Sequence, residues 1–276
     1  MLFQPAVQNY EWNFAPSILA MLLSQAVLFG YLISLSRKDG RWGTDVKPRH
    51  ILWFALGLFT IFIALVSPLD ALSNYASFGA HMTQHILLAI VAPICLLLGT
   101  PAFWIRYVFT LPIVKQVLRV LVNPFIAFAI FNVVLWAWHL PSLYEGALRD
   151  PNVHILEHTM FMVTGVIAWA PILFALPPDA PLGYLTKIAY LFFNMISSSI
   201  LAAIFTFAPT VIYPFYGDAM LRFGLTALDD QQLAGAIMWV PGGGIFLAAT
   251  LIAFAAWLNN EDRKGQAKYP PPPHAA

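Results

Sequence analysis

The chain has 276 residues, of which 60% are hydrophobic and only 10% are charged, and its formal net charge is +1. Soluble domains are about 45–50% apolar and about 25% charged, so the composition excludes an ordinary soluble enzyme or binding module and indicates an integral membrane protein. The basic residues are spread over loops between apolar segments, so nothing in the sequence indicates binding to nucleic acid.

Apolar runs of about 20 residues recur along the chain, and each is long enough to cross a hydrocarbon core of about 30 Å as a helix. They predict an all-α membrane protein with seven transmembrane helices in one domain, residues 1–258. The predicted spans are 16–36, 50–67, 79–99, 124–141, 154–175, 186–207 and 232–258. The sequence "PGGG" at 241–244 predicts a kink in the last span, and residues 259–276, with their run of prolines, are expected to form a disordered tail.

The basic residues predict the orientation of these spans, because Lys and Arg accumulate in cytoplasmic loops. All but two of the 14 Lys and Arg residues fall in loops 37–49 and 100–123, at the start of the sixth span or after the seventh. Only Arg149 and Arg222 fall on the opposite side. The amino terminus is therefore expected outside, and the carboxyl terminus in the cytoplasm.

Two pairs of histidines stand out at the outer ends of predicted spans. "HMTQH" places His81 and His85 four residues apart, and "HILEH" does the same for His154 and His158. Residues at this spacing lie on one face of a helix, so each pair presents two ring nitrogens in the same direction. Histidine inside a membrane is costly and marks a functional site, so the two pairs predict a metal or cofactor site near the outer face.

Three neighbours extend this predicted site. Met82 lies three residues before His85 and is a candidate soft ligand, and Glu157 is three residues after His154. His139, at the outer end of the fourth span, is a further candidate ligand, although a lone histidine at a helix end often serves only as a hydrogen-bonding cap. Asp230 is expected at the same level, where it and Glu157 would accept ring N–H bonds and fix the imidazoles.

The spacing alone leaves the bound group open. Imidazole binds zinc, copper, iron and nickel. "HILEH" fits the H-x-x-E-H pattern of zinc hydrolases, in which the glutamate acts as general base. Haem is another alternative, with His85 and His158 as axial ligands from two facing helices.

Several phrases, in order and at their spacing, resemble the multispanning CtaG-type cytochrome c oxidase assembly factors. They are "SPLD" (67–70), "HMTQHILL…P…LLLGTP" (81–101), "WHLPSLYEGAL" (138–148), "H…EH" (154–158) and "DQQLAGAIMWVPGG" (230–243). The resemblance implies a bacterial plasma-membrane protein needed to build a haem-copper oxidase, with copper delivery as the proposed role. The matching positions are His81, Gln84, His85, His139, His154, Glu157, His158, Asp230 and Gln231.

Residues and resemblance together give a working hypothesis. Cu(I) would bind to His81, His85, His154 and His158, with His139 and Met82 as further candidate ligands. Residues expected to position these ligands without binding the ion are Glu157, Asp230, Gln84 and Gln231. The expected partners are an oxidase subunit in the same bilayer and a periplasmic copper donor. Such a metallochaperone would not be an enzyme. A zinc hydrolase, a haem-binding electron carrier and a purely structural scaffold are the alternatives.

Overall fold

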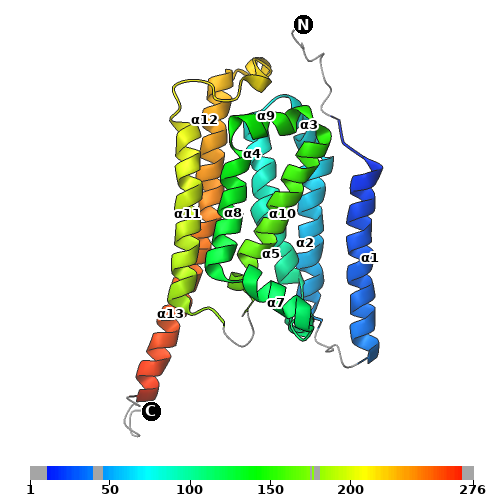
Figure 1. Ribbon diagram of the computed structural model, residues 1–276, viewed down its shortest axis with the longest axis vertical. Helices are drawn as coiled ribbons and strands as arrows, with labels where there is room; N and C mark the ends of the chain where they lie inside the picture. The colour runs from blue at the N-terminus through cyan, green and yellow to red at the C-terminus, as the bar shows by residue number, and fades with distance from the viewer. Residues whose placement is uncertain (1–10, 40–45, 175, 177–180, 269–276) are drawn as a thin grey trace.

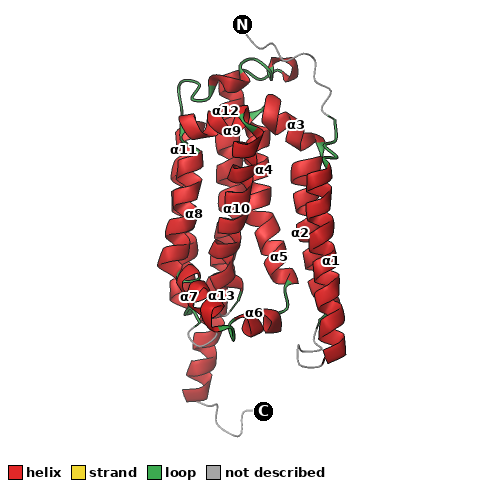
Figure 2. Ribbon diagram, turned by 45° about the vertical axis from the view of Figure 1, so that its right-hand side comes forward, coloured by secondary structure: helices red, strands yellow, loops and turns green. Residues whose placement is uncertain are grey.

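The computed structural model describes residues 11–39, 46–174, 176 and 181–268, and the long helices of this part of the chain run side by side as a bundle (Figure 1; Figure 2). Helices α3 (Pro68–Tyr75) and α9 (Pro141–Arg149) lie at one end, which we call the α3–α9 end. Helices α6 (Ala102–Val108) and α7 (Pro112–Leu121) lie at the other, the α6–α7 end. The all-helical prediction is confirmed for the described residues.

Within those residues, six helices are long and apolar enough to cross a membrane. They are α1 (Pro16–Asp39), α2 (Pro48–Val66), the run of α4 (Phe78–Ile86), η1 (Leu87–Val91) and α5 (Ala92–Gly99), α10 (Pro151–Leu173), α11 (Tyr184–Thr206), and the run of α12 (Ala227–Ile237), η4 (Met238–Gly242) and α13 (Gly243–Lys268). These helices correspond to all the predicted spans except the fourth.

The predicted fourth span, 124–141, is shorter than expected. Helix α8 (Pro124–Trp138) has 15 residues and so rises only about 22 Å. It qualifies as a span only together with α7, from which it is bent by 67°. The bend arises because Pro124 cannot continue a helix from α7, and the side chain of Asn123 caps α8 afresh by accepting bonds from the next two free backbone N–H groups. The described residues therefore contain six spans, or up to seven.

The last span is longer than predicted and contains a π turn where the kink was predicted. It begins at Ala227 because Thr226 and Asp229 form a capping box, and Pro241 lies inside the π turn η4. The helix then continues to Lys268. Residues 259–268, expected to be disordered, are therefore helical; residues 269–276 lie outside the described part of the chain.

Helix α10 packs closely on the third span. Figure 2 shows α10 in front of α4 and α5, and it contacts α5, η1, α8 and α9. At Gly165 the approach is so close that a Cβ would overlap the backbone carbonyl oxygen of Ala89 in η1. This contact holds α10 against the helix that carries His81 and His85.

We predict that Gly165→Ala destabilises the protein by about 1–3 kcal/mol, because backbone atoms of Ala89 must move to accommodate one methyl group. The measurement is the thermal unfolding midpoint in detergent. Gly30→Ala in α1 is the matched control, since a Cβ there meets nothing within 4 Å. Equal midpoints for Gly165→Ala and the unmodified chain would contradict the close packing of α10 on η1.

Candidate metal centre

Helix α4 presents the first histidine pair, and its start is held by Asp230 of α12. The Asp230 carboxylate accepts hydrogen bonds from the Ser77 hydroxyl (2.7 Å) and from the backbone N–H groups of Phe78 (2.6 Å) and Gly79 (3.3 Å). A carboxylate at a helix amino terminus satisfies free donors and interacts favourably with the helix dipole. Asp230 therefore fixes where α4 begins, and with it the direction in which His81 points.

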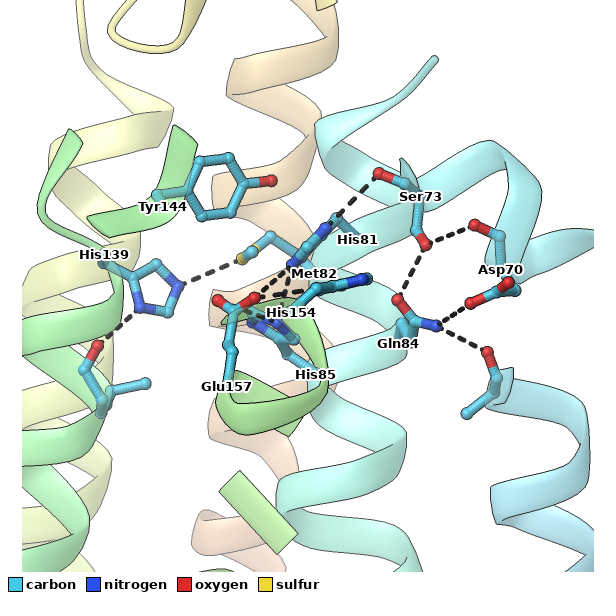
Figure 3. A network of polar contacts seen from close by, with 12 residues as sticks. Asp70, Ser73, His81, Met82, Gln84, His85, His139, Tyr144, His154 and Glu157 are labelled. Carbon is cyan, nitrogen blue, oxygen red and sulfur yellow. Dashed lines mark hydrogen bonds and ion pairs between the residues drawn. The ribbon is translucent and has the colours of Figure 1, made fainter. Parts of the chain in front are cut away.

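Helix α10 presents the second pair from the facing side. It begins at Pro151, and the side chain of Asp150 caps it by accepting a bond from the Asn152 N–H at 2.8 Å. His154, Glu157 and His158 therefore fall in its first two turns, and the side chain of Glu157 points toward His81 and His85 (Figure 3). The two sequence motifs thus face each other near the α3–α9 end.

The facing side chains form a compact group of nitrogen and oxygen donors. Each of His81, His154, Glu157 and His158 offers one atom, and these atoms all lie within 4.8 Å of one another. His85 adjoins them: its Nε2 lies 2.7 Å from His81 Nε2 and 3.5 Å from Glu157 Oε1. We call these five residues the His/Glu cluster. The spacing of the donor atoms is small enough for one metal ion to contact several of them.

Five buried donor atoms of the His/Glu cluster lack a hydrogen-bond partner in the described part of the chain. The buried atoms here without a hydrogen-bond partner are His85 Nδ1, His154 Nε2, His158 Nε2, and both carboxylate oxygens of Glu157, which lie 3.5–3.9 Å from the Nε2 atoms of His81, His85 and His154. The side chains of His81 and Glu157 are fully buried. Each unsatisfied buried group costs about 1–3 kcal/mol, and a native protein keeps few of them. Five such atoms in one place fit a site that a cation occupies in the working protein.

His139 and Met82 contact each other beside the His/Glu cluster (Figure 3). His139 Nε2 lies 3.3 Å from the sulfur of Met82, while His139 Nδ1 lies 2.6 Å from the carbonyl oxygen of Leu135. The structure therefore places these two predicted ligands next to the cluster, with the ring centre of His139 5.9 Å from that of His85. The capping role considered for a lone histidine matches the Nδ1 bond but leaves Nε2 free for another partner.

Gln84 and Gln231 bond to polar groups outside the His/Glu cluster. Gln84 donates to the carbonyl oxygen of Ala64 (2.7 Å) and to Asp70 (3.1 Å), and accepts from Ser73 (2.8 Å), which ties α4 to α2 and α3. Gln231 accepts from the backbone N–H of Ile212 at 2.6 Å and so fixes the segment after α11. Gln84 therefore helps to position the helix that carries His81 and His85, and both glutamines bond to groups other than the imidazoles.

Two buried tyrosines adjoin His81 and were not among the predicted site residues. The Tyr216 hydroxyl donates to the carbonyl oxygen of Ser73 (2.9 Å), and it lies 2.7 Å from the Tyr144 hydroxyl and 3.4 Å from His81 Nδ1. Burial raises the pKa of both phenols well above the ordinary value, so they stay neutral and supply hydrogen bonds, not anionic charge. The sequence could not place them beside His81, because that contact depends on how α9 and the segment after α11 pack against α4.

Residues 28–260 match the family described as cytochrome c oxidase caa3 assembly factor. This chain belongs to that family. The match covers all the residues of the His/Glu cluster, and it confirms the resemblance drawn from the sequence motifs. The geometry above therefore describes a member of an oxidase assembly family.

Curated relatives exist in mycobacteria. An uncharacterized protein of Mycobacterium bovis and another of Mycobacterium tuberculosis are each 26% identical to the chain over 226 residues. The matched part covers 75% of this chain and 33% of each relative, so the chain spans about a third of the length of these relatives. No solved structure gives a significant match.

We predict that Asp230→Asn lowers the free energy of unfolding by about 1–3 kcal/mol. In asparagine, an NH₂ donor replaces one of the two carboxylate oxygens. This donor would face the Ser77 hydroxyl or the backbone N–H groups at the start of α4, so a buried donor there loses its acceptor. Asp218→Asn, at an exposed position, is the matched control and should leave the unfolding midpoint unchanged. A midpoint for Asp230→Asn equal to that of the control would show that Asp230 does not hold the start of α4.

Proposed function

We propose that this chain binds copper as Cu(I) at the His/Glu cluster and delivers it to cytochrome c oxidase during assembly. The observation that carries the proposal is the group of buried, unpartnered donor atoms on His85, His154, Glu157 and His158. The family indicates the biological process, oxidase assembly, because its members are described as oxidase assembly factors. Copper is then the cargo of the chain, not a resident cofactor.

Charge balance favours a monovalent ion. Charges are costly in a low-dielectric interior unless they are offset nearby, and the cluster holds one carboxylate, that of Glu157, among neutral imidazoles. Cu(I) with one carboxylate is electrically neutral, whereas Zn²⁺ in the same place leaves an excess positive charge. Imidazole is a good ligand for copper, so the donor set also fits.

The zinc hydrolase alternative is less well supported. Glu157 fits the H-x-x-E-H pattern, but a general base must reach a water and a substrate. The side chains of Glu157 and His81 are fully buried, which leaves a large substrate no access to them. We therefore propose that the chain acts as a metallochaperone without catalysing a reaction of its own.

We further propose that the α3–α9 end faces the outside of a bacterial inner membrane. Arg106, Lys115 and Arg119 lie on α6 and α7 at the opposite end, whereas Arg149 lies on α9. Basic residues accumulate on the cytoplasmic side, which supports this orientation. The His/Glu cluster would then lie close to the outer face, where it could take Cu(I) from a periplasmic donor and pass it to an oxidase subunit in the same bilayer.

We predict that His81→Ala/His85→Ala lowers the affinity for Cu(I) at least a hundred-fold, about 2.7 kcal/mol, because two ring nitrogens are removed from the site. The measurement is competition for Cu(I) between the full chain in detergent and a chromogenic chelator. His274→Ala, a histidine far along the sequence from both motifs, is the control and should bind as the unmodified chain does.

Two results would contradict the proposed function. Unchanged Cu(I) affinity in the double variant would exclude the cluster as the copper site. A Soret band in the unmodified chain that the double variant lacks would assign the histidines to haem.

A further inference from the structure

The pair formed by His139 and Met82 has the features of a second ligand set. The carbonyl oxygen of Leu135 can only accept a hydrogen bond, so His139 Nδ1, at 2.6 Å, is the donor and carries the proton. The neutral ring then has a lone pair on Nε2, which faces the thioether sulfur of Met82 at 3.3 Å. Neither atom has a proton to donate to the other, so this contact is not an ordinary hydrogen bond.

The separation of these two atoms suits a shared metal ion. A metal bond of about 2.0 Å to nitrogen and about 2.3 Å to sulfur places the two donors about 3–4 Å apart at the usual coordination angles. The observed 3.3 Å falls in this range. Met82 is fully buried and His139 nearly so, which shields the pair from water.

His85 connects this pair to the His/Glu cluster. Its Nε2 lies 2.7 Å from His81 Nε2, on the cluster side. Its Nδ1 has no partner among the described residues, and its ring centre lies 5.9 Å from that of His139. His85, Met82 and His139 also line the same pocket, of about 40 Å³. A buried imidazole with an unpartnered nitrogen therefore borders both ligand sets.

Apart from Ser198, the rest of the pocket lining is apolar, and it includes residues of the π turns η1 and η4. Ala89 and Ile90 come from η1, and Met238 and Gly242 come from η4. Among the described residues that line the pocket there is no carboxylate. Thioether and imidazole donors in apolar surroundings select a soft ion of low charge, and Cu(I) is the biological metal ion that fits this description.

We propose that Met82, His139 and His85 form a second Cu(I) site, to which the ion moves from the His/Glu cluster by exchange of ligands around His85. This proposal rests on the proposed function. In the exchange, the ion loses its bonds to Glu157 and the histidines of α10, and it gains bonds to Met82 sulfur and His139 Nε2. Copper stays Cu(I) in both positions, so no electron is transferred. The second site takes the ion from a cluster with a carboxylate to an apolar pocket inside the bundle, and a proton taken up by Glu157 offsets the charge that the ion leaves behind.

The test is a Cu(I) titration of the full chain in detergent, combined with copper K-edge X-ray absorption. We expect two bound equivalents and a copper–sulfur distance of about 2.3 Å. Met82→Leu, which nearly preserves side-chain volume, should bind one equivalent and lose the sulfur contribution. Met162→Leu in α10 is the matched control and should keep both. His139→Gln should lose the same equivalent as Met82→Leu, which guards against an indirect effect of one variant.

The outcomes separate this proposal from the one on which it rests. Glu157→Gln should weaken the cluster and leave the copper bound through sulfur in place, which would support two sites. One equivalent without sulfur in the unmodified chain, or a sulfur contribution that persists in Met82→Leu, would overturn the second site while leaving copper binding at the cluster intact. No Cu(I) bound to the unmodified chain would overturn both proposals.

Discussion

The buried carboxylate of Glu157 imposes the main physical constraint on this bundle. An ionised carboxylate in an apolar interior needs a cation or several donors to offset its charge, and neither oxygen of Glu157 has a hydrogen-bond partner in the described part of the chain. The side chains around it are imidazoles, which supply no charge while neutral. The charge is offset only if something positive joins it, and in the function proposed above Cu(I) does so with one unit of charge. A proton would also offset it, but a protonated carboxyl alone would leave the ring nitrogens of His154 and His158 unpartnered.

The remainder of the fold keeps the donors in place around that carboxylate. Asp230 sets the start of α4, and the close contact at Gly165 holds α10 against η1. The Tyr216 hydroxyl, which is bonded to that of Tyr144, contacts the ring of His81 from the α3–α9 end. Groups held in this way need little rearrangement when an ion binds, so less of the binding free energy is spent on ordering them. The two π turns, η1 and η4, both lie beside the pocket below the cluster, and π turns inside helices are frequent at functional sites.

The sequence predicted the parts of the structure that depend on local pattern. Apolar runs located the long helices, and the i, i+4 spacing placed His81 with His85 and His154 with His158, because both patterns follow from helix geometry alone. It could not predict the partners of Asp230, Gln84 or Met82, since the contacts of a side chain with other helices depend on how the helices pack. The short α8 was also missed, because the bend at Pro124 depends on the cap that Asn123 provides. Residues 259–268 were predicted to be disordered because they are polar, but they contain no proline that would end the helix, and α13 continues through them.

The central claim is that copper reaches the oxidase through the His/Glu cluster, and the copper-to-haem ratio of the oxidase tests it most directly. The oxidase would be purified from native host cells in which the Glu157→Gln variant replaces the unmodified chain, with Glu145→Gln, at a partly exposed position paired with Arg149, as the matched control. If copper is handed on through the cluster, the oxidase from the Glu157→Gln cells contains haem but less than half the copper of the control. An oxidase with the full copper-to-haem ratio in both strains would contradict the account.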